Sequence, residues 1–319
     1  MLELDWNLKK KFEEATTALK TRLRQKPGKA FLRKIITEKG AGIFRKCRKL
    51  DAGTLSIIVE KGGVAGVDGS TNSGGGTFPY VITLQQAMAM ACQKQGGEIV
   101  LSDAFSPLLM EETMSEDDYR EYVKKNLAVL EANAALLALE EFKPAVLLMD
   151  GSLVRFKIEA SHLWDRLGQK SFEQGTLLAG VVEGISTGII YSVLKDEVPQ
   201  VPAGAMDWEI LSGILEVGEV LEMAPGLFKE GFRTCFARFS TDPRPIGIDT
   251  PEEQDGFLEQ VEDLIFTLTP ENGRGIPVWL DIIDNKVKIT DMMMEGLMNS
   301  HLGQDYAEFI SPKRNKRMR

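Results

Sequence analysis

Two aspartates occur in the same local pattern, Asp68 in Val-Asp-Gly-Ser and Asp150 in Met-Asp-Gly-Ser. Each follows an apolar run and precedes a glycine, so each is predicted at the carboxyl end of a strand where the backbone turns. Asp-Gly pairs also occur in ordinary turns, but a second copy with the same serine favours a shared role. Carboxylate oxygens are the ligands that hard divalent cations prefer, so the pattern suggests a metal site.

Two further carboxylates extend this set. Glu131 is the one charged residue between Asn126 and Leu139, and its neighbours at helical spacing are apolar, so its burial would need a cation or hydrogen-bond donors. The alternative is a surface position on the polar edge of the helix. Asp284 is predicted where the last apolar strand passes into a helix, with Asp281 inside that strand. Asp284 can therefore be an N-cap, a metal ligand or both.

Asp68, Glu131, Asp150 and Asp284 would thus lie on a strand, a helix, a strand and a helix start. Two divalent ions held by such a set can activate a water and stabilise the leaving oxygen in phosphodiester hydrolysis. The polar stretch after Asp68 is also similar to the first phosphate loop of actin-like ATPases. That reading requires a second phosphate loop and an adenosine-binding segment, and neither is found in the sequence.

The composition indicates a protein with a folded core and no membrane-spanning segment. The chain has 319 residues and 43% hydrophobic content, which is enough to fill a core. No run of 18 or more apolar residues occurs, so we expect no membrane segment and a cytoplasmic location. Residues 1–49 hold fifteen Lys and Arg against five Asp and Glu, and residues 313–319 add five cations, whereas the chain as a whole carries a net charge of −9. Basic ends on an acidic body suit contact with a polyanion or an acidic partner, or are simply solvated.

Periodicity predicts an order of elements along the chain. Helices are expected at residues 4–49 with a break at Pro27 and Gly28, and at residues 115–142, 254–268 and 284–302. Strands are expected at residues 55–70 (two short strands around Gly62 and Gly63), 78–91, 98–107, 145–153, 175–194 (a pair or a bent strand), 232–240 and 276–283. The first strands follow one another through short turns and predict an antiparallel meander, whereas the strand after the long helix predicts parallel pairing.

The predicted fold class is therefore α/β, with a mixed sheet of antiparallel meander and parallel strands flanked by helices. Three segments are expected: a helical N-terminal arm at 1–50, the main domain at 51–312 and a basic tail at 313–319.

The order of elements and the residues together resemble the NurA family of DNA-repair nucleases, whose domain has a ribonuclease H-like fold. The resemblance spreads over roughly residues 55–300, and its paired Asp-Gly-Ser motifs are its most specific feature. The matching marks are Gly-Val-Asp-Gly-Ser at 66–70, Leu-Leu-Met-Asp-Gly-Ser-Leu at 147–153, Glu131 within the long helix, the segment 232–240, and Ile-Pro-Val-Trp-Leu-Asp-Ile-Ile-Asp-Asn-Lys-Val-Lys-Ile at 276–289.

Position by position, the resemblance implies that Asp68, Glu131 and Asp150 are metal ligands. Many members have an Ala-His pair at the start of the last helix, where this chain has Ile283 and Asp284. Aspartate is an oxygen donor, so Asp284 is a chemically sensible fourth ligand in place of the histidine.

The resemblance further implies exonucleolytic and endonucleolytic cleavage of DNA with Mn²⁺ or Mg²⁺, two ions per site. It implies a homodimer that works beneath a hexameric HerA-type ATPase in the resection of double-strand breaks. Two alternatives remain open at this point. One is a catalytically inactive ribonuclease H-like module that binds DNA or a partner, and the other is an actin-like ATPase.

Overall fold

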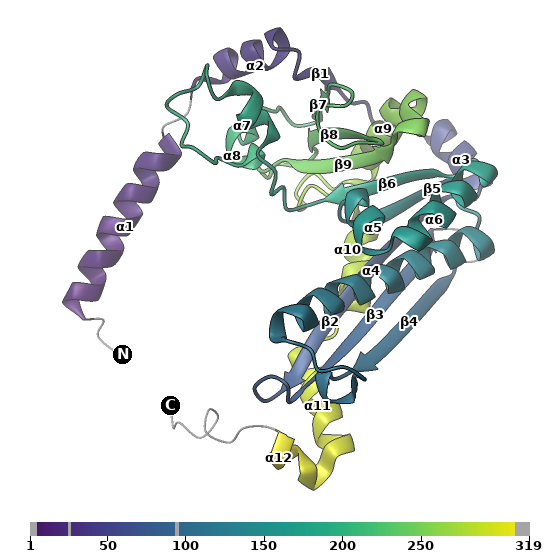
Figure 1. The fold of residues 1–319 in the computed structure, drawn as a ribbon. Coiled ribbons are helices and arrows are strands. Elements are labelled where there is room, and N and C mark those ends of the chain that lie inside the picture. The colour runs from purple at the N-terminus through teal and green to yellow at the C-terminus, as the bar shows by residue number, and fades with distance from the viewer. Residues whose placement is uncertain (1–4, 25–26, 93–95, 310–319) are drawn as a thin grey trace.

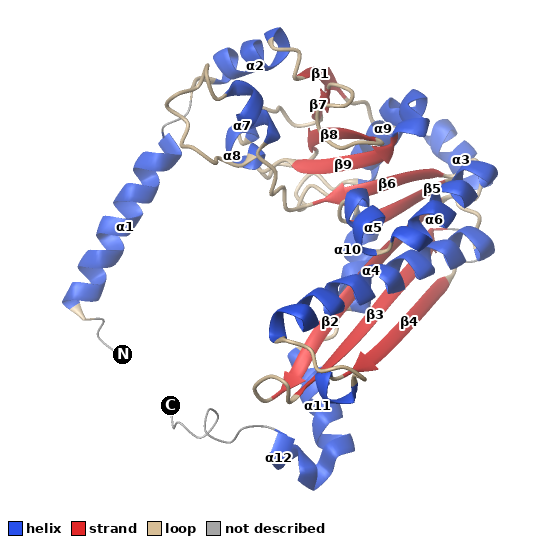
Figure 2. Cartoon of the chain, viewed as in Figure 1, coloured by secondary structure: helices blue, strands red, loops and turns tan. Residues whose placement is uncertain are grey.

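A nine-stranded mixed sheet runs through the computed structural model, which describes residues 5–24, 27–92 and 96–309 (Figures 1 and 2). Within those residues the strand order is β1-β7-β8-β9-β6-β5-β2-β3-β4. The strands are β1 (Gly42–Lys46), β2 (Val64–Gly75), β3 (Val81–Cys92), β4 (Glu98–Phe105), β5 (Val146–Asp150), β6 (Leu177–Val182), β7 (Glu219–Met223), β8 (Phe232–Arg238) and β9 (Ile246–Pro251).

The sheet combines an antiparallel meander with parallel strands. β2, β3 and β4 pair in antiparallel order, as the short turns predicted. β5 pairs parallel to β2 on one side and to β6 on the other, because the long helix between β4 and β5 carries the chain back to the starting edge. The predicted fold class is confirmed.

Helices cover both faces of the central strands. The helices of the described residues are α1 (Trp6–Arg24), which stands apart from the sheet, and α2 (Lys29–Glu38), α3 (Ala52–Glu60), α4 (Glu116–Glu141), α5 (Leu153–Glu159), α6 (Ser161–Gln174), α7 (Ile189–Leu194), α8 (Asp207–Leu211), α9 (Leu258–Leu268), α10 (Val278–Val287), α11 (Asp291–Leu302) and α12 (Tyr306–Phe309). Figure 1 shows α4 along the meander, with α10 and α11 behind the sheet. The Ser115 hydroxyl accepts a hydrogen bond from the Asp118 N–H at 3.2 Å, so the predicted long helix begins at its predicted cap.

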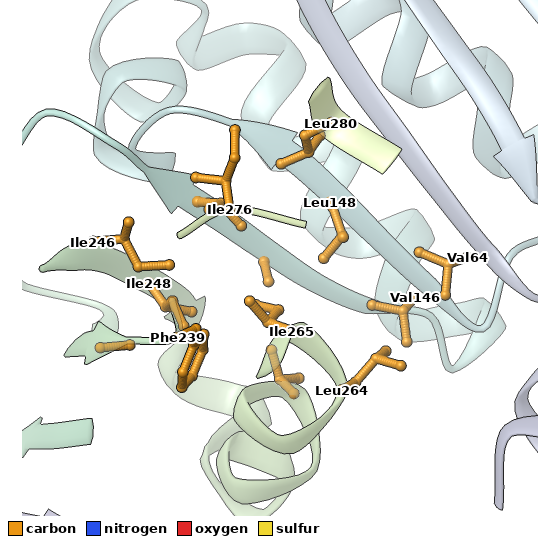
Figure 3. Close-up of a cluster of buried hydrophobic side chains, with 14 of the residues drawn as sticks. Val64, Val146, Leu148, Phe239, Ile246, Ile248, Leu264, Ile265, Ile276 and Leu280 are labelled. Atoms are coloured by element: carbon orange, nitrogen blue, oxygen red, sulfur yellow. The ribbon is translucent and has the colours of Figure 1, made fainter. Parts of the chain in front are cut away.

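Two cores fill the space between the helices and the central strands. On one face, alternate strand residues such as Leu148 and Ile248 pack against Leu264 of α9 and Leu280 of α10 (Figure 3). On the other face, Leu147 and its strand neighbours pack against α4, α5 and α6. Strand residues alternate between the faces, so consecutive residues of β5 contribute to different cores.

Residues 52–60 form a helix, so the strand predicted before Gly62 is wrong. Asp51 caps α3, and its Oδ1 accepts a hydrogen bond from the Thr54 N–H at 2.8 Å. No residue of α3 is fully buried, and Ile57 is 54% exposed. A short apolar run fits a strand or a helix by composition, and the aspartate cap decides for the helix.

Residues 278–287 form α10, so the buried strand predicted at 276–283 is also wrong. Pro277 precedes the helix, and the buried side chains are Leu280, Ile283 and Val287, which are spaced three and four residues apart. α10 packs directly on β2, because a Cβ at Gly66 would lie 2.6 Å from Ile283 Cδ1. The predicted helix over 284–302 is accordingly divided between α10 and α11.

Two other predictions need correction. Residues 175–194 contain the single strand β6 followed by α7, not a strand pair or one bent strand. The predicted helical segment at 4–49 contains α1 and α2, but Gly42–Lys46 form β1, which pairs with β7 at the edge of the sheet. The predicted helical arm is therefore shorter than residues 1–50, and the basic tail at 313–319 lies outside the described residues. None of the helices in the described ranges has the length and apolar content needed to cross a membrane.

Candidate active site

Asp68 and Asp150 lie beside each other at the centre of the sheet. β2 and β5 are parallel neighbours in which Val67 is paired with Met149, so the two aspartates occupy the next position on both strands. Asp68 is 7% exposed, and its Oδ1 accepts a hydrogen bond from the Gly69 N–H at 2.7 Å. The repeated Asp-Gly-Ser motif thus brings two carboxyl groups to one place. Asp150 ends β5 as predicted, but the prediction that a strand ends at Asp68 is wrong, because β2 continues to Gly75 and stays paired with β3.

Burial and the charges of neighbouring carboxylates make both carboxyl groups reluctant to ionise. Burial, and then the charges of Asp150 and Asp284, raise the pKa of Asp68 to about 7. Burial, and then the charges of Asp284 and Glu183, raise the pKa of Asp150 to about 6, although the charge of Arg274 and a hydrogen bond with Asp68 oppose this rise. The charges of Arg155 and Arg274 offset this rise only in part, and carboxyl groups with pKa values so perturbed characterise functional sites more than structural ones.

Asp284 faces this pair from α10. The prediction that it begins a helix is wrong, because it is the seventh residue of α10, and Asp281 lies in the first turn of that helix instead of in a strand. Packing of α10 on β2 nevertheless brings Asp284 close enough for its charge to raise the pKa of Asp68 and of Asp150. Three of the four predicted residues therefore share one face of the sheet.

Glu131 approaches from the opposite face, on α4. It is 2% exposed, so the alternative of a surface position is wrong. Its carboxylate pairs with the guanidinium of Arg155 on α5, and a Cβ at position 69 would lie 2.4 Å from Glu131 Oε1. Only glycine at position 69 leaves room for this side chain next to the Asp68 backbone. The glycine of the first motif therefore admits the third carboxylate.

Three residues of this region were missed by sequence reasoning: Arg155, which pairs with Glu131, and Glu183 and Arg274. Glu183 follows β6 and continues the alternation of that strand, two positions after Val181, which is paired with Asp150. Arg274 precedes α10, and its Nη1 donates to Glu183 Oε2 at 3.0 Å. The alternation along β6 could have indicated Glu183, but nothing in the sequence around Arg274 points to the site.

The serines of the two motifs hold neighbouring elements in place. Ser70 Oγ accepts a hydrogen bond from the Ile289 N–H at 3.0 Å, which fixes the link between α10 and α11. Ser152 Oγ donates to Asp249 Oδ2 of β9 at 2.8 Å, and Lys229 Nζ donates to the same oxygen at 2.7 Å. The residues after Asp68 thus pair with β3 and bind the segment that follows α10. This role argues against the reading of the stretch as the phosphate loop of an actin-like ATPase.

The donor set suits a hard divalent cation by chemistry, since every candidate ligand is a carboxylate. In the conformation described, no three His, Cys, Asp or Glu side chains of the described residues are placed to hold a metal ion together. Arginines contact two of the candidates, Arg155 at Glu131 and Arg274 at Asp284. Binding of a metal would therefore require side-chain movement around Asp68 and Asp150.

The fold and this carboxylate-lined sheet define an α/β protein with an acidic centre, and comparison with known proteins identifies its relatives. The family model for the NurA domain matches residues 62–289, so the chain belongs to the NurA domain family. A search of curated proteins found no significant match.

Solved structures extend the comparison. The NurA nuclease from Sulfolobus solfataricus aligns with a TM-score of 0.58 at 14% identity, over 95% of this chain and 98% of that one. An endonuclease V from Bacillus subtilis aligns with a TM-score of 0.41 at 14% identity, over 88% of this chain and 97% of that one. Human ENDOV aligns with a TM-score of 0.42 at 16% identity, over 84% of this chain and 97% of that one. At these identities the likeness to the Sulfolobus protein establishes the fold.

Proposed function

We propose that this chain is a DNA nuclease that hydrolyses phosphodiester bonds with Mn²⁺ or Mg²⁺, using two ions. The observation that carries the proposal is the pairing of the buried Asp68 with the half-buried Asp150, which lie side by side on β2 and β5 with Asp284 facing them, in a member of the NurA domain family. Such a cluster gains most from a divalent cation, because the cation removes the repulsion that burial intensifies.

The proposed ligands are Asp68, Glu131, Asp150 and Asp284, and Glu183 joins them as a candidate from the structure. When bound, the metal ions supply Lewis acidity toward a phosphoryl oxygen and a water of lowered pKa. The residues of this chain fix the site. Parallel pairing holds Asp68 against Asp150, and the space over Gly69 holds Glu131 at the same level of the sheet.

Arg155 orients Glu131 in this proposal. Its guanidinium is held over the Phe156 ring at 4.6 Å and contacts Glu131 Oε2. Glu131 Oε1 lies over Gly69, where it can accept a proton or a hydrogen bond from the attacking water. Arg155 therefore acts through Glu131 as a positioning residue.

We also propose an oligomeric state, a partner and a cellular process for this chain. The family resemblance supports a homodimer that works with a hexameric HerA-type ATPase in DNA end resection in the cytoplasm. Exposed lysines of α1, among them Lys9, Lys10 and Lys11, supply cations for DNA phosphates or for an acidic partner.

End-labelled single-stranded and duplex DNA, incubated with Mn²⁺, Mg²⁺ or EDTA, provides the test. We expect cleavage with either metal and none with EDTA, with loss of cleavage in Asp68→Asn, Glu131→Gln, Asp150→Asn and Asp284→Asn. Asp117→Asn on α4, where the side chain is 93% exposed, is the matched control and should cut like the wild type.

Four outcomes would contradict the proposal. Cleavage that persists in EDTA, or in Asp68→Asn and Asp150→Asn prepared in parallel, would place the chemistry elsewhere. Failure of the wild type to cut even with its cognate ATPase would favour the inactive module. Tight binding of ATP by the isolated chain would favour the actin-like ATPase.

A further inference from the structure

Arg274 joins carboxylates from two separate elements. Its Nη1 donates to Glu183 Oε2 at 3.0 Å, its Nη2 lies 3.4 Å from Asp284 Oδ2, and its Nε donates to Asp281 Oδ1 at 3.0 Å. Glu183 follows β6, whereas Asp281 and Asp284 lie one turn apart on α10. One guanidinium therefore closes the gap between the sheet and the helix that carry the proposed site.

These contacts differ in their strength and exposure. Arg274 and Asp284 are each 44% exposed, and Glu183 is 38% exposed, so both ion pairs are of the weak, solvated kind. Asp281 is 27% exposed and contacts both Nε and Nη2 of the guanidinium. The contact with Asp281 can therefore hold the arginine at the rim of the site while the other two contacts break.

The position of Arg274 conflicts with metal binding at the same carboxylates. The described side chains leave no three ligating residues placed around one metal position. Arg274 contacts Asp284, a proposed ligand, and Glu183, whose charge raises the pKa of Asp150. A divalent cation that uses these oxygens has to take the place of the guanidinium.

Building on the proposed nuclease function, we propose that Arg274 is an exchangeable cation of the site. It neutralises Glu183 and Asp284 in the metal-free protein, leaves them when a divalent metal enters, and then donates its freed N–H groups to a phosphate oxygen of the bound DNA. The planar fork of donors on arginine suits a carboxylate and a phosphate equally well, so one side chain can serve in both states. Asp281 is the tether that keeps it in place during the exchange.

Mn²⁺ titration by calorimetry, without DNA, tests the competition. In Arg274→Gln we expect Mn²⁺ affinity to rise roughly three- to tenfold, because two exposed ion pairs no longer have to be broken. Arg274→Lys keeps the charge and should stay close to the wild type. Arg244→Gln is the matched control, since Arg244 is also exposed, pairs with Asp242 and lies within the field of Glu183.

DNA binding measured with and without metal tests the second half of the proposal. With Ca²⁺ present and the DNA shown to be uncut, Arg274→Gln should bind duplex DNA about tenfold more weakly than the wild type, with a salt slope smaller by about one. In EDTA the two proteins should bind DNA equally, because Arg274 is then engaged with carboxylates. An arginine that simply faces DNA would give the same loss in both conditions.

The two proposals fail separately. If the wild type neither binds Mn²⁺ nor cuts DNA, the proposed function is wrong. If the wild type binds Mn²⁺ and cuts DNA, but Arg274→Gln shows unchanged Mn²⁺ affinity or loses DNA affinity equally in EDTA, the exchange is wrong and the nuclease stands.

Discussion

Asp207 and Asp68 are both buried aspartates, but their surroundings differ in kind. Asp207, at the start of α8, accepts hydrogen bonds from the Thr187 hydroxyl at 2.8 Å and from the N–H groups of Ile189 and Ile190 at 3.1 and 2.8 Å. Asp68 accepts one from the Gly69 N–H and shares a hydrogen bond with the carboxyl group of Asp150, and the charge of Arg155 does not offset the burial that raises its pKa. The first aspartate stabilises a loop and a short helix, whereas the second is left with an unmet demand for positive charge.

This difference distinguishes an aspartate that is buried to stabilise the fold from one that is buried in a functional site. Burying a carboxylate is costly, and a protein that buries one for stability surrounds it with donors. A pair of carboxylates that repel each other in the core lowers stability and persists when a ligand supplies the missing charge. The contrast between the two aspartates leads to four predictions, taken from the largest expected effect to the smallest.

Asp150→Asn should reduce metal-dependent DNA cleavage roughly a thousandfold, because loss of a ligand removes several kcal/mol of transition-state stabilisation. Single-turnover cleavage with saturating Mn²⁺ measures the effect. Circular dichroism and unfolding in urea would show that the variant remains folded. A loss below tenfold would remove Asp150 from the site.

Asp207→Ala should lower the free energy of unfolding by about 3 kcal/mol, because the N–H groups of Ile189 and Ile190 lose their acceptor inside the core. Cleavage per folded molecule should not change. Asp196→Ala, at an exposed position after α7, is the control. If the folded fraction of Asp207→Ala cleaved DNA more slowly than the wild type, the conclusion that Asp207 serves only stability would be wrong.

Gly69→Ala should reduce cleavage up to about a hundredfold with little change in thermal stability. A Cβ at this position would lie 2.4 Å from Glu131 Oε1 and 2.8 Å from its Cγ, so the Glu131 side chain would have to leave its present position. Gly168→Ala on α6, where a Cβ meets no atom within 4 Å, should leave cleavage unchanged and raise thermal stability slightly, because alanine favours a helix interior over glycine. Wild-type cleavage in Gly69→Ala would mean that the position of Glu131 does not matter.

Asp68→Asn should raise the stability of the metal-free protein by about 2 kcal/mol at pH 8. Folding raises the pKa of Asp68 to about 7 from an ordinary value of 3.8, so the protonated carboxyl group is the form that the native state favours. The contribution of Asp68 to wild-type stability is therefore complete below pH 4 and is lost as the pH rises through 7.

The pH dependence makes this prediction specific. Urea unfolding in EDTA should show equal stability of the two proteins near pH 4 and a growing advantage of the variant toward pH 8. Saturating Mn²⁺ should reverse the order at pH 8, because only the wild type retains the charged ligand. An advantage that did not change with pH would indicate a packing effect instead.

The elements that carry the acidic residues differ in how far local sequence predicted them. α4 was predicted because Ser115 caps it and a long run of helix formers follows, and β5 because its apolar run is short and ends at Asp-Gly. α3 and α10 were misassigned as strands, since short apolar runs have no clear period. β9, which holds the buried Asp249, was not predicted.

Sequence alone determined that Asp150 ends an apolar strand, that Asp68 follows the apolar part of its strand, and that Glu131 lies within a helix with apolar neighbours. Caps, turns and side-chain periods depend on residues close in the chain, which is why these features could be predicted. Only the tertiary structure decided that Glu131 reaches the site over Gly69 and that Arg274 meets Glu183, which is 91 positions away. Such contacts depend on strand order and on how helices pack across a sheet. These follow from the burial of whole apolar faces, which no local pattern specifies.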